Sequence, residues 1–286
     1  MIRGLYTAAS GMLARWNEMD VVSNNLANVD TVGFKKDEVL LKAFPEMLIR
    51  RMKSDGVVQF PLGSYDIAPV VGQLGTGVEV NDIQTRFDQG MNMKKTHNDF
   101  DLALEGKGFF AVETERGERF TRNGSFLIDD NSYLVTKEGY KVLGENGYIQ
   151  VKHNNFKVDK DGTILYNSIY PNEDLGIMVD REQNSFDFPQ IKDRLKIVNF
   201  YDPRELVKEG NNFFRESIHS GKPDILEVGG GRPNVMQGFL ETSNVNPVLE
   251  MVKMISIQRN YEANSKVLQT QDQLLGKATN ELARVY

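Results

Sequence analysis

The side chains that most often carry chemistry are few and widely spaced in this sequence. The 286 residues include three histidines, His97, His153 and His219, and no cysteine. Zinc sites draw on closely spaced histidines and cysteines, and no two histidines here are neighbours in the sequence. The absence of cysteine also excludes disulfides, thiolate ligands and cysteine nucleophiles. The histidines are interpreted as ordinary surface or packed side chains, and no metal site is predicted.

One acidic stretch superficially resembles the start of a calcium-binding loop. Asp159-Lys160-Asp161-Gly162 places two carboxylates before a glycine. A calcium loop needs a further oxygen ligand at the correct spacing and a closing glutamate, and this stretch has neither. An Asp-Gly pair between two apolar runs is typical of a tight turn. We therefore expect a β-hairpin that joins residues 156–158 to residues 163–166.

The glycine-rich stretches do not match a phosphate-binding loop. Neither residues 72–77 nor residues 229–231 are followed by the Gly-Lys-Ser/Thr that such a loop requires. The Gly-x-Ser-x-Gly elbow of the α/β-hydrolases is also missing. The sequence therefore predicts no catalytic residue, no cofactor and no enzymatic activity.

Composition narrows the class of protein further. Lys and Arg number 34 against 40 Asp and Glu, which gives a net charge of −6. Such a balance argues against a nucleic-acid partner, because phosphates are neutralised by a basic surface. No apolar run is long enough to cross a membrane as a helix. The N-terminus makes a poor cleavable signal peptide, because Gly, Thr and Ser interrupt its short apolar stretch.

The two ends of the chain share a helical pattern that the middle lacks. Apolar side chains recur every seven residues at both ends, which is typical of a coiled-coil seam. The N-terminal helix is expected over residues 5–28, where Asn-rich turn chemistry follows, and the C-terminal helix from Pro247 towards Ala283. Asn264 and Gln271 interrupt the second seam and are expected to set its register. The seam positions are Leu5, Met12, Met19 and Leu26 with Trp16 alongside, and Met254, Ile257, Tyr261, Leu268, Leu275 and Leu282.

The middle of the chain reads as short strands separated by Gly and Asn turns. Asn123-Gly124 between two apolar runs predicts a further hairpin. The fold class is therefore α+β, with long terminal helices pairing as a coiled coil around a central antiparallel β-sandwich or partly open barrel. The expected division is a helical domain (1–34 with 245–286), connecting segments (35–81 and 202–244) and a β-domain (82–201).

Several stretches together resemble one known family. Residues 23–28 (Ser-Asn-Asn-Leu-Ala-Asn) and Gly33-Phe34-Lys35 resemble the N-terminal signature of bacterial flagellar rod and hook proteins. Residues 101–110 and 120–126 resemble the β-domain signature of that family, and Gly210-Asn211-Asn212 also fits. Residues 237–246 and 254–266 resemble its C-terminal signature. The opening residues and the stretch 43–51 are more similar to the F-type, proximal rod subunit than to the G-type, distal one, whereas residues 167–193 match nothing familiar.

The resemblance implies a structural role. Such a protein is a subunit of the basal-body rod, exported unfolded through the flagellar type III apparatus without a cleaved signal, and located in the periplasm. Its partners would be other copies of itself, neighbouring rod and hook subunits, and ring or bushing proteins. The assembly interface would include the seam positions above together with Asn24, Asn25, Asn28, Gly33, Phe34 and Gln258. The first alternative is a distal rod subunit or a hook-like axial protein of the same family. More distant alternatives are a cell-wall hydrolase and an adaptor that binds the axis without polymerising.

Overall fold

A computed structural model describes residues 2–50, 57–60, 63–66, 70–88, 93–152, 156–167, 189–226 and 231–283. His153, Gly229, Gly230, the side chain of Leu282 and most of residues 167–193 lie outside the described parts. The chain divides into two compact units. The first comprises Met1–Leu26, Asp37–Gln84 and Pro247–Tyr286, and the second comprises Ala27–Lys36 and Thr85–Asn246.

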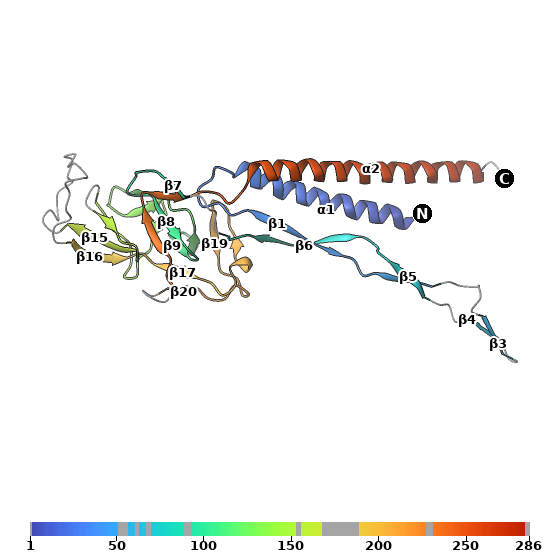
Figure 1. Cartoon of the computed structure of the whole chain (residues 1–286), viewed down its shortest axis with the longest axis horizontal. Coiled ribbons are helices and arrows are strands. Elements are labelled where there is room, and N and C mark those ends of the chain that lie inside the picture. The colour runs from blue at the N-terminus through green and yellow to red at the C-terminus, as the bar shows by residue number, and fades with distance from the viewer. Residues whose placement is uncertain are drawn as a thin grey trace. The chain divides into compact units, whose positions relative to one another are not determined.

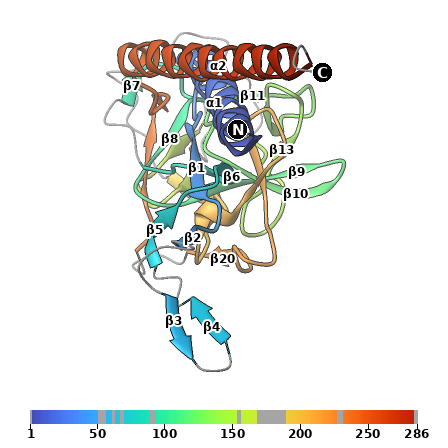
Figure 2. The ribbon, with the colours of Figure 1, turned by 90° about the vertical axis from the view of Figure 1, so that its right-hand side faces the viewer.

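The first unit holds both helices and a two-stranded arm. Helix α1 spans Ile2–Ala27 and helix α2 spans Pro247–Ala283, which confirms the two helices expected from the heptad spacing. Figures 1 and 2 show α1 and α2 side by side, with the arm beginning next to α1. The described residues between 37 and 85 form this arm of paired strands. That residues 35–81 connect the helical domain to the β-domain stays a prediction. The arm pairs β1 (Asp37–Ala43) with β6 (Val78–Thr85), β2 (Met47–Arg50) with β5 (Val70–Leu74), and β3 (Val57–Phe60) with β4 (Gly63–Asp66).

The second unit is built around one nine-stranded sheet. Its strands follow the order β11-β12-β13-β9-β10-β19-β18, and β17 pairs with both β9 and β20. Three smaller pairings accompany it: β14-β15-β16, β21-β8 and β22-β7. The bounds in the large sheet are β9 (Phe109–Thr114), β10 (Gly117–Thr121), β11 (Phe126–Ile128), β12 (Leu134–Thr136), β13 (Lys141–Val142), β17 (Ile197–Asn199), β18 (Val207–Lys208), β19 (Phe213–Arg215) and β20 (Asp224–Ile225). The others are β7 (Met93–Lys95), β8 (Leu102–Glu105), β14 (Lys157–Val158), β15 (Thr163–Asn167), β16 (Pro189–Arg194), β21 (Asn234–Gln237) and β22 (Phe239–Glu241), with a 3₁₀ turn η1 at Pro203–Glu205.

Strand β9 is the centre of the hydrophobic core. Side chains alternate between the two faces of a strand, so Phe110 and Val112 enter one apolar cluster while Phe109 and Ala111 enter another. All four are buried. A strand with apolar residues on both faces therefore divides the core of this unit into two layers.

The structure corrects two expectations about the β-rich unit. Its antiparallel sheets do not close into a barrel, because the large sheet ends at β11 and β18 and the remaining strands form separate small sheets. The Asn123-Gly124 hairpin is also wrong, since β10 pairs with β9 and β19, whereas β11 pairs with β12. The Gly124 carbonyl instead accepts a hydrogen bond from Leu102 N at 2.9 Å. The hairpin expected at Asp161-Gly162 is confirmed by the pairing of β14 with β15.

Within the described residues, no helix is long and apolar enough to cross a membrane. The same residues contain no group of three or more His, Asp or Glu side chains placed to hold a metal ion.

A candidate assembly surface and its buried support

Helices α1 and α2 of the first unit lie antiparallel, and glycines of α1 face polar residues of α2. A Cβ added to Gly4 would lie 2.5 Å from Gln271 Nε2, and one added to Gly11 would lie 3.0 Å from Asn264 Nδ2. Towards the other end of α1, Glu18 approaches Lys253 at 3.8 Å. Along this series of contacts the residue numbers rise on α1 and fall on α2, so the two helices run in opposite directions. Glycines on α1 thus provide the space that the two polar seam residues of α2 occupy.

The apolar seam positions lie beside this contact. Ile257 is buried. The other expected seam residues with described side chains are half-buried, namely Leu5, Met12, Met19, Leu26, Met254, Tyr261, Leu268 and Leu275. Three expected interface residues, Trp16, Asn24 and Gln258, are exposed. Supercoiling of the two helices stays a prediction, since these contacts show adjacency and direction only.

A second surface of α1 is covered by the arm. Thr7 Oγ1 donates to Thr76 O at 3.1 Å, and Val78 N donates to Ser10 Oγ at 3.3 Å. Gly77 allows this approach, because it holds φ at 150° and a Cβ there would lie 2.5 Å from Ser10 Oγ. The arm therefore follows α1 closely along its first turns.

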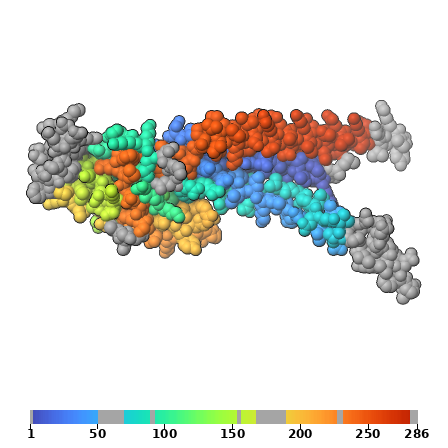
Figure 3. Space-filling model, viewed as in Figure 1, coloured from blue at the N-terminus to red at the C-terminus, as the bar shows by residue number. Residues whose placement is uncertain are grey.

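The outer faces of both helices carry large apolar side chains in contact with solvent. Trp16 is 57% exposed and Val252 is 61% exposed. Among the described side chains of the two helices, those that are large, apolar and exposed are Tyr6, Leu13 and Trp16 on α1, and Val248, Leu249, Met251, Val252, Ile255, Val267 and Leu274 on α2. A shallow groove of about 280 Å³ on α2 is lined by Val252, Ile255, Ser256, Arg259 and Asn260. In the space-filling view α2 is uncovered along its length (Figure 3). We call these outer faces the helix surface.

Asn25 ties the end of α1 to the start of the arm. Its Nδ2 donates to Asp37 O at 2.8 Å, and its Oδ1 accepts from Asp37 N at 2.9 Å. The side chain is 1% exposed, so both polar atoms depend on these bonds. Asn28 lies in the following turn and accepts from Thr31 Oγ1 at 3.1 Å. Of the three asparagines expected at this helix end, Asn24 is exposed.

Replacing Asn25 with alanine should destabilise the first unit by roughly 1–3 kcal/mol, because both backbone groups of Asp37 lose their partner. Thermal unfolding followed through the fluorescence of Trp16, the single tryptophan, measures this change. Asn24→Ala is the matched control, since its side chain is exposed. Equal melting temperatures for the two variants would contradict the role given to Asn25.

The second unit contains a buried ion cluster that joins three distant segments. Lys35 Nζ contacts Glu241 Oε1 at 2.8 Å, and Arg122 Nη1 contacts Glu241 Oε2 at 3.4 Å. Lys35 also donates to Asp88 O at 3.1 Å, and Arg122 donates to Gly106 O at 2.7 Å. All three charged side chains are at most 3% exposed. One carboxylate therefore holds two buried cations.

Burial is the main influence on the pKa values of the two cations in this cluster. Desolvation lowers the pKa of Lys35 below its usual value, although the neighbouring Glu241 carboxylate opposes that shift. The pKa of Arg122 is lowered for the same reason and opposed by the same partner. The Arg122 guanidinium also stands 5.4 Å from the centre of the Phe109 ring. Both cations are thus costly to bury and depend on Glu241.

The residues around the cluster leave little space. Gly33 adopts φ of 68°, and a Cβ there would lie 2.5 Å from Asn123 N. Gly33 N donates to Glu241 O at 2.9 Å, while Phe34 is buried under Lys208, whose Nζ lies 4.3 Å from the ring centre. Asn25, Gly33 and Phe34 were expected at the assembly interface. The structure places them inside the subunit, because their polar or aromatic groups are taken up by the chain's own backbone and side chains.

A more exposed cluster stabilises the edge formed by β10, β18 and β19. Glu209 accepts from Arg119 Nε at 2.7 Å and lies 3.0 Å from Arg215 Nε. The hydrogen bond from Arg119 lowers the pKa of Glu209 below its usual 4.5. A carboxyl whose folded pKa is depressed contributes stability above its unfolded pKa and loses it as the pH falls through the folded pKa.

The stability difference between the wild type and Glu209→Gln should therefore be present at neutral pH and shrink below about pH 4.5. Denaturant unfolding of both proteins between pH 7 and pH 3, followed by circular dichroism, provides the comparison. Glu138→Gln serves as control, since Glu138 is exposed. A difference that stays constant over the whole range would show that Glu209 contributes nothing through its charge.

The comparisons with known proteins cover nearly the whole chain. Residues 5–35 match the model described as flagella basal body rod protein, residues 103–166 the flagellar hook protein FlgE/F/G D1 domain, and residues 236–281 the flagellar basal body rod FlgEFG protein C-terminal. The flagellar basal-body rod protein FlgG of Borreliella burgdorferi is 36% identical over 98% of both chains. FlgG of Bacillus subtilis is 33% identical over 98% of this chain and 99% of that protein. FlgF of Caulobacter vibrioides is 29% identical over the full length of both.

These comparisons support a structural role for the chain, that of a rod subunit. The chain belongs to the family of flagellar basal-body rod proteins of the F and G type. Its family name places it in the flagellar basal body, in assembly with other rod and hook subunits. In Caulobacter vibrioides the FlgG and FlgF proteins are 32% and 29% identical to this chain, so identity does not single out the F-type favoured by the opening residues.

Sequence reasoning missed the buried ion cluster, although its members lie in the signature stretches. Lys35 follows Gly33-Phe34, Arg122 precedes Asn123-Gly124, and Glu241 ends the stretch that begins at Gln237. A charged residue inside each of three otherwise uncharged or apolar motifs is the signal that could have indicated a buried ionic contact. The N-terminal, middle and C-terminal signatures therefore meet at Glu241.

Proposed function

We propose that the chain polymerises into the helical rod that acts as the drive shaft between the flagellar motor and the hook, with the helix surface as its inner contact. The main support for this proposal is the apolar helix surface, because exposing a row of Trp, Leu, Val and Ile side chains to water is unfavourable for an isolated subunit. Neighbouring subunits would cover it. Contacts in an open helical tube are heterologous, so each copy uses one part of this surface to bind below and another to bind above.

The terminal helices are the elements proposed to complete their packing on assembly. The register of Gly11 against Asn264 and Gly4 against Gln271 supports a defined α1–α2 pair, onto which further helices add as a coiled coil. We further propose that the chain is exported unfolded through the flagellar type III apparatus without signal cleavage and assembles in the periplasm. Its freedom from cysteine is compatible with that route. Ring or bushing proteins around the rod are further proposed partners.

Deletion of the gene, followed by electron microscopy of isolated basal bodies, tests this function. Basal bodies without a rod are expected if the chain occupies the proximal position, and a truncated rod without a hook if it occupies the distal one. Complementation with the wild-type gene should restore complete structures. Intact rods bearing normal hooks would overturn the proposal and favour the adaptor alternative. A structural family gives no reason to propose enzymatic activity on the cell wall.

A further inference from the structure

A turn in the second unit presents two apolar side chains to solvent. Tyr201 and Ile218 are each 97% exposed, the highest values among the large apolar side chains in the described parts of the chain. Tyr201 follows β17, and Ile218 lies between β19 and β20. Their loops adjoin, because Asp202 N donates to Ser220 O at 3.4 Å. We call Tyr201 and the turn 216–221 the apolar knob.

The knob is held rigidly. Ser217 N donates to Ser220 Oγ at 2.8 Å, and Ser220 N donates to Ser217 Oγ at 3.0 Å. Ser220 Oγ in turn donates to Ser217 O at 3.0 Å, and the Ser220 residue is fully buried. A turn fixed by its own hydrogen bonds loses little conformational freedom when it binds, so it can act as an anchor. Its apolar tip has no packing partner within the described chain.

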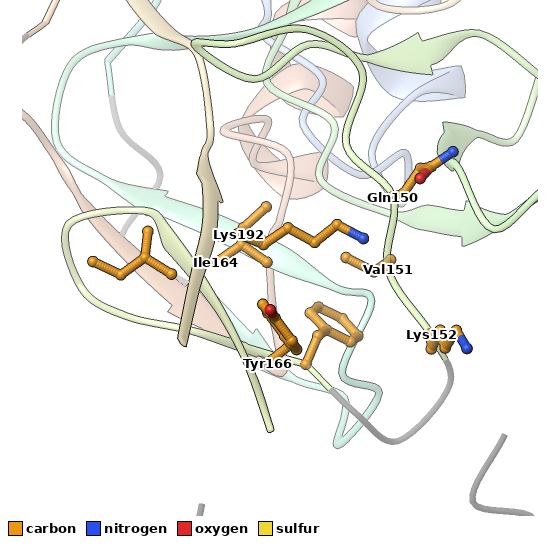
Figure 4. A pocket seen from close by; sticks show the side chains of 8 residues that line it. Gln150, Val151, Lys152, Ile164, Tyr166 and Lys192 are labelled. Atoms are coloured by element: carbon orange, nitrogen blue, oxygen red, sulfur yellow. The ribbon is translucent and has the colours of Figure 1, made fainter. Parts of the chain in front are cut away.

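A pocket on the same unit has the complementary character. It has a volume of about 350 Å³ and lies between β15, β16 and residues 150–152. Its floor is apolar, formed by Val151, Phe156 and Ile164. Ile191 and Tyr166 line it as well, and Lys152 and Lys192 complete it. Figure 4 shows Lys192 extending from β16 towards Val151 on the opposite wall.

The described residues that line the pocket include two lysines and no carboxylate, whereas the knob carries a glutamate, Glu216. Neither Lys152 nor Lys192 forms an ion pair with a described carboxylate, and the two lysines repel each other. Desolvation by the pocket wall, and then this repulsion, lower the pKa of Lys192. Glu216 is exposed, stands two residues before Ile218, and likewise has no described ion-pair partner. If Ile218 of another copy contacted the apolar floor, the Glu216 carboxylate of that copy would come within reach of Lys152 and Lys192.

The two features are placed for a head-to-tail contact. Figure 1 shows β15 and β16 at one end of the second unit and β19, which the knob follows, at the other. The knob and the pocket are formed by different elements of this unit, the knob by the turns after β17 and β19 and the pocket by β15, β16 and residues 150–152. A knob and a pocket on separate surfaces of identical subunits produce heterologous contacts, which continue from copy to copy.

We propose that the apolar knob of one copy inserts Ile218 and Tyr201 into the pocket of the next copy, with Glu216 paired to Lys192. This contact rests on the proposed polymerisation and identifies the outer surfaces through which the copies associate. It is separate from the helix surface, because every residue involved belongs to the second unit.

Crosslinking tests the contact directly, because the chain has no native cysteine. The double variant Ile218→Cys with Ile191→Cys places one thiol on the knob and one beside the pocket, both at exposed positions. Isolated basal bodies carrying it are treated with a short thiol-reactive crosslinker. We expect a ladder of dimers, trimers and larger species. Each single variant alone should give none, and the two single variants coexpressed should give dimers only.

The other outcomes separate this contact from the proposed function. Rods that contain the double variant but yield only monomers overturn the contact and leave polymerisation intact. Dimers without larger species overturn its head-to-tail form. Absence of the wild-type chain from rods overturns both proposals. As a second measurement, Glu216→Lys and Lys192→Glu should each reduce rod yield at least tenfold, and their combination should restore it. Failure of the combination to restore assembly contradicts the pairing.

Discussion

Glu241→Gln should lower the free energy of unfolding of the second unit by about 3–5 kcal/mol, because it leaves two buried cations without their carboxylate. The substitution preserves the size of the side chain but removes its negative charge. Lys35 and Arg122 would then remain buried without a counter-ion, 2.8 and 3.4 Å from a neutral amide. Most domains are only 5–15 kcal/mol more stable than their unfolded state, so such a loss threatens folding at physiological temperature.

The measurement is denaturant unfolding followed by far-UV circular dichroism, with Trp16 fluorescence as a separate signal for the first unit. Glu138→Gln is the matched control, because the same chemical change at an exposed position should leave the transition unchanged. If Glu241→Gln fails to fold, Lys35→Met provides a milder comparison, since Arg122 then keeps its partner. A Glu241→Gln protein as stable as the control would show that the cluster contributes no net charge stabilisation.

The helices were predictable because their signals are local. A seven-residue apolar period and the proline at position 247 define α2 without information from the rest of the fold, and its observed start is Pro247. The same holds for the Asp161-Gly162 hairpin, whose two strands adjoin the turn. Where the contacts that determine an element lie within a few residues of it in the sequence, the sequence pattern is sufficient to predict that element.

The failed hairpin at Asn123-Gly124 shows where local reasoning ends. Its turn chemistry is favourable, yet Arg122 is drawn into the core by Glu241, and a Cβ on Gly124 would lie 1.6 Å from Leu102 O. These partners come from opposite ends of the second unit's sequence. Tertiary contacts therefore decided the path of the chain, and the glycine is required for close backbone approach.

The candidate interface was only partly predictable for a related reason. Heptad spacing identifies which residues line a seam, but it does not distinguish burial within the subunit from burial between subunits. Ile257 is buried already, whereas Trp16, on the neighbouring stripe of α1, is exposed. Gly33 and Phe34 belong to a signature and are buried within the subunit, and their expected role at the interface stays a prediction. The exposed row on α2 contains residues such as Val252 and Ile255 that lie off the expected seam.

Ile255→Asp should prevent incorporation of the subunit into rods while leaving the isolated protein folded. Ile255 is 52% exposed in the subunit and lines the groove on α2, so a carboxylate there is hydrated before assembly. Burial of an unpaired carboxylate against a neighbouring subunit costs several kcal/mol. Because about 1.4 kcal/mol is a tenfold change in an equilibrium constant, a loss of at least a hundredfold in association is expected.

Gln269→Asp is the matched control for Ile255→Asp, because it introduces the same charge at an exposed polar position of the same helix. Motility and the yield of complete rods in a deletion strain give the readout, and circular dichroism of both purified variants establishes that each is folded. Normal rods with Ile255→Asp would remove this part of α2 from the assembly contact. Equal defects in both variants would instead show that α2 tolerates no added charge, so that the apolar character of Ile255 would not be what the neighbouring subunit requires. If only Ile255→Asp abolishes rod formation, then rod formation depends on the apolar side chain of Ile255. Apolar character is the property that all the exposed residues of this row share.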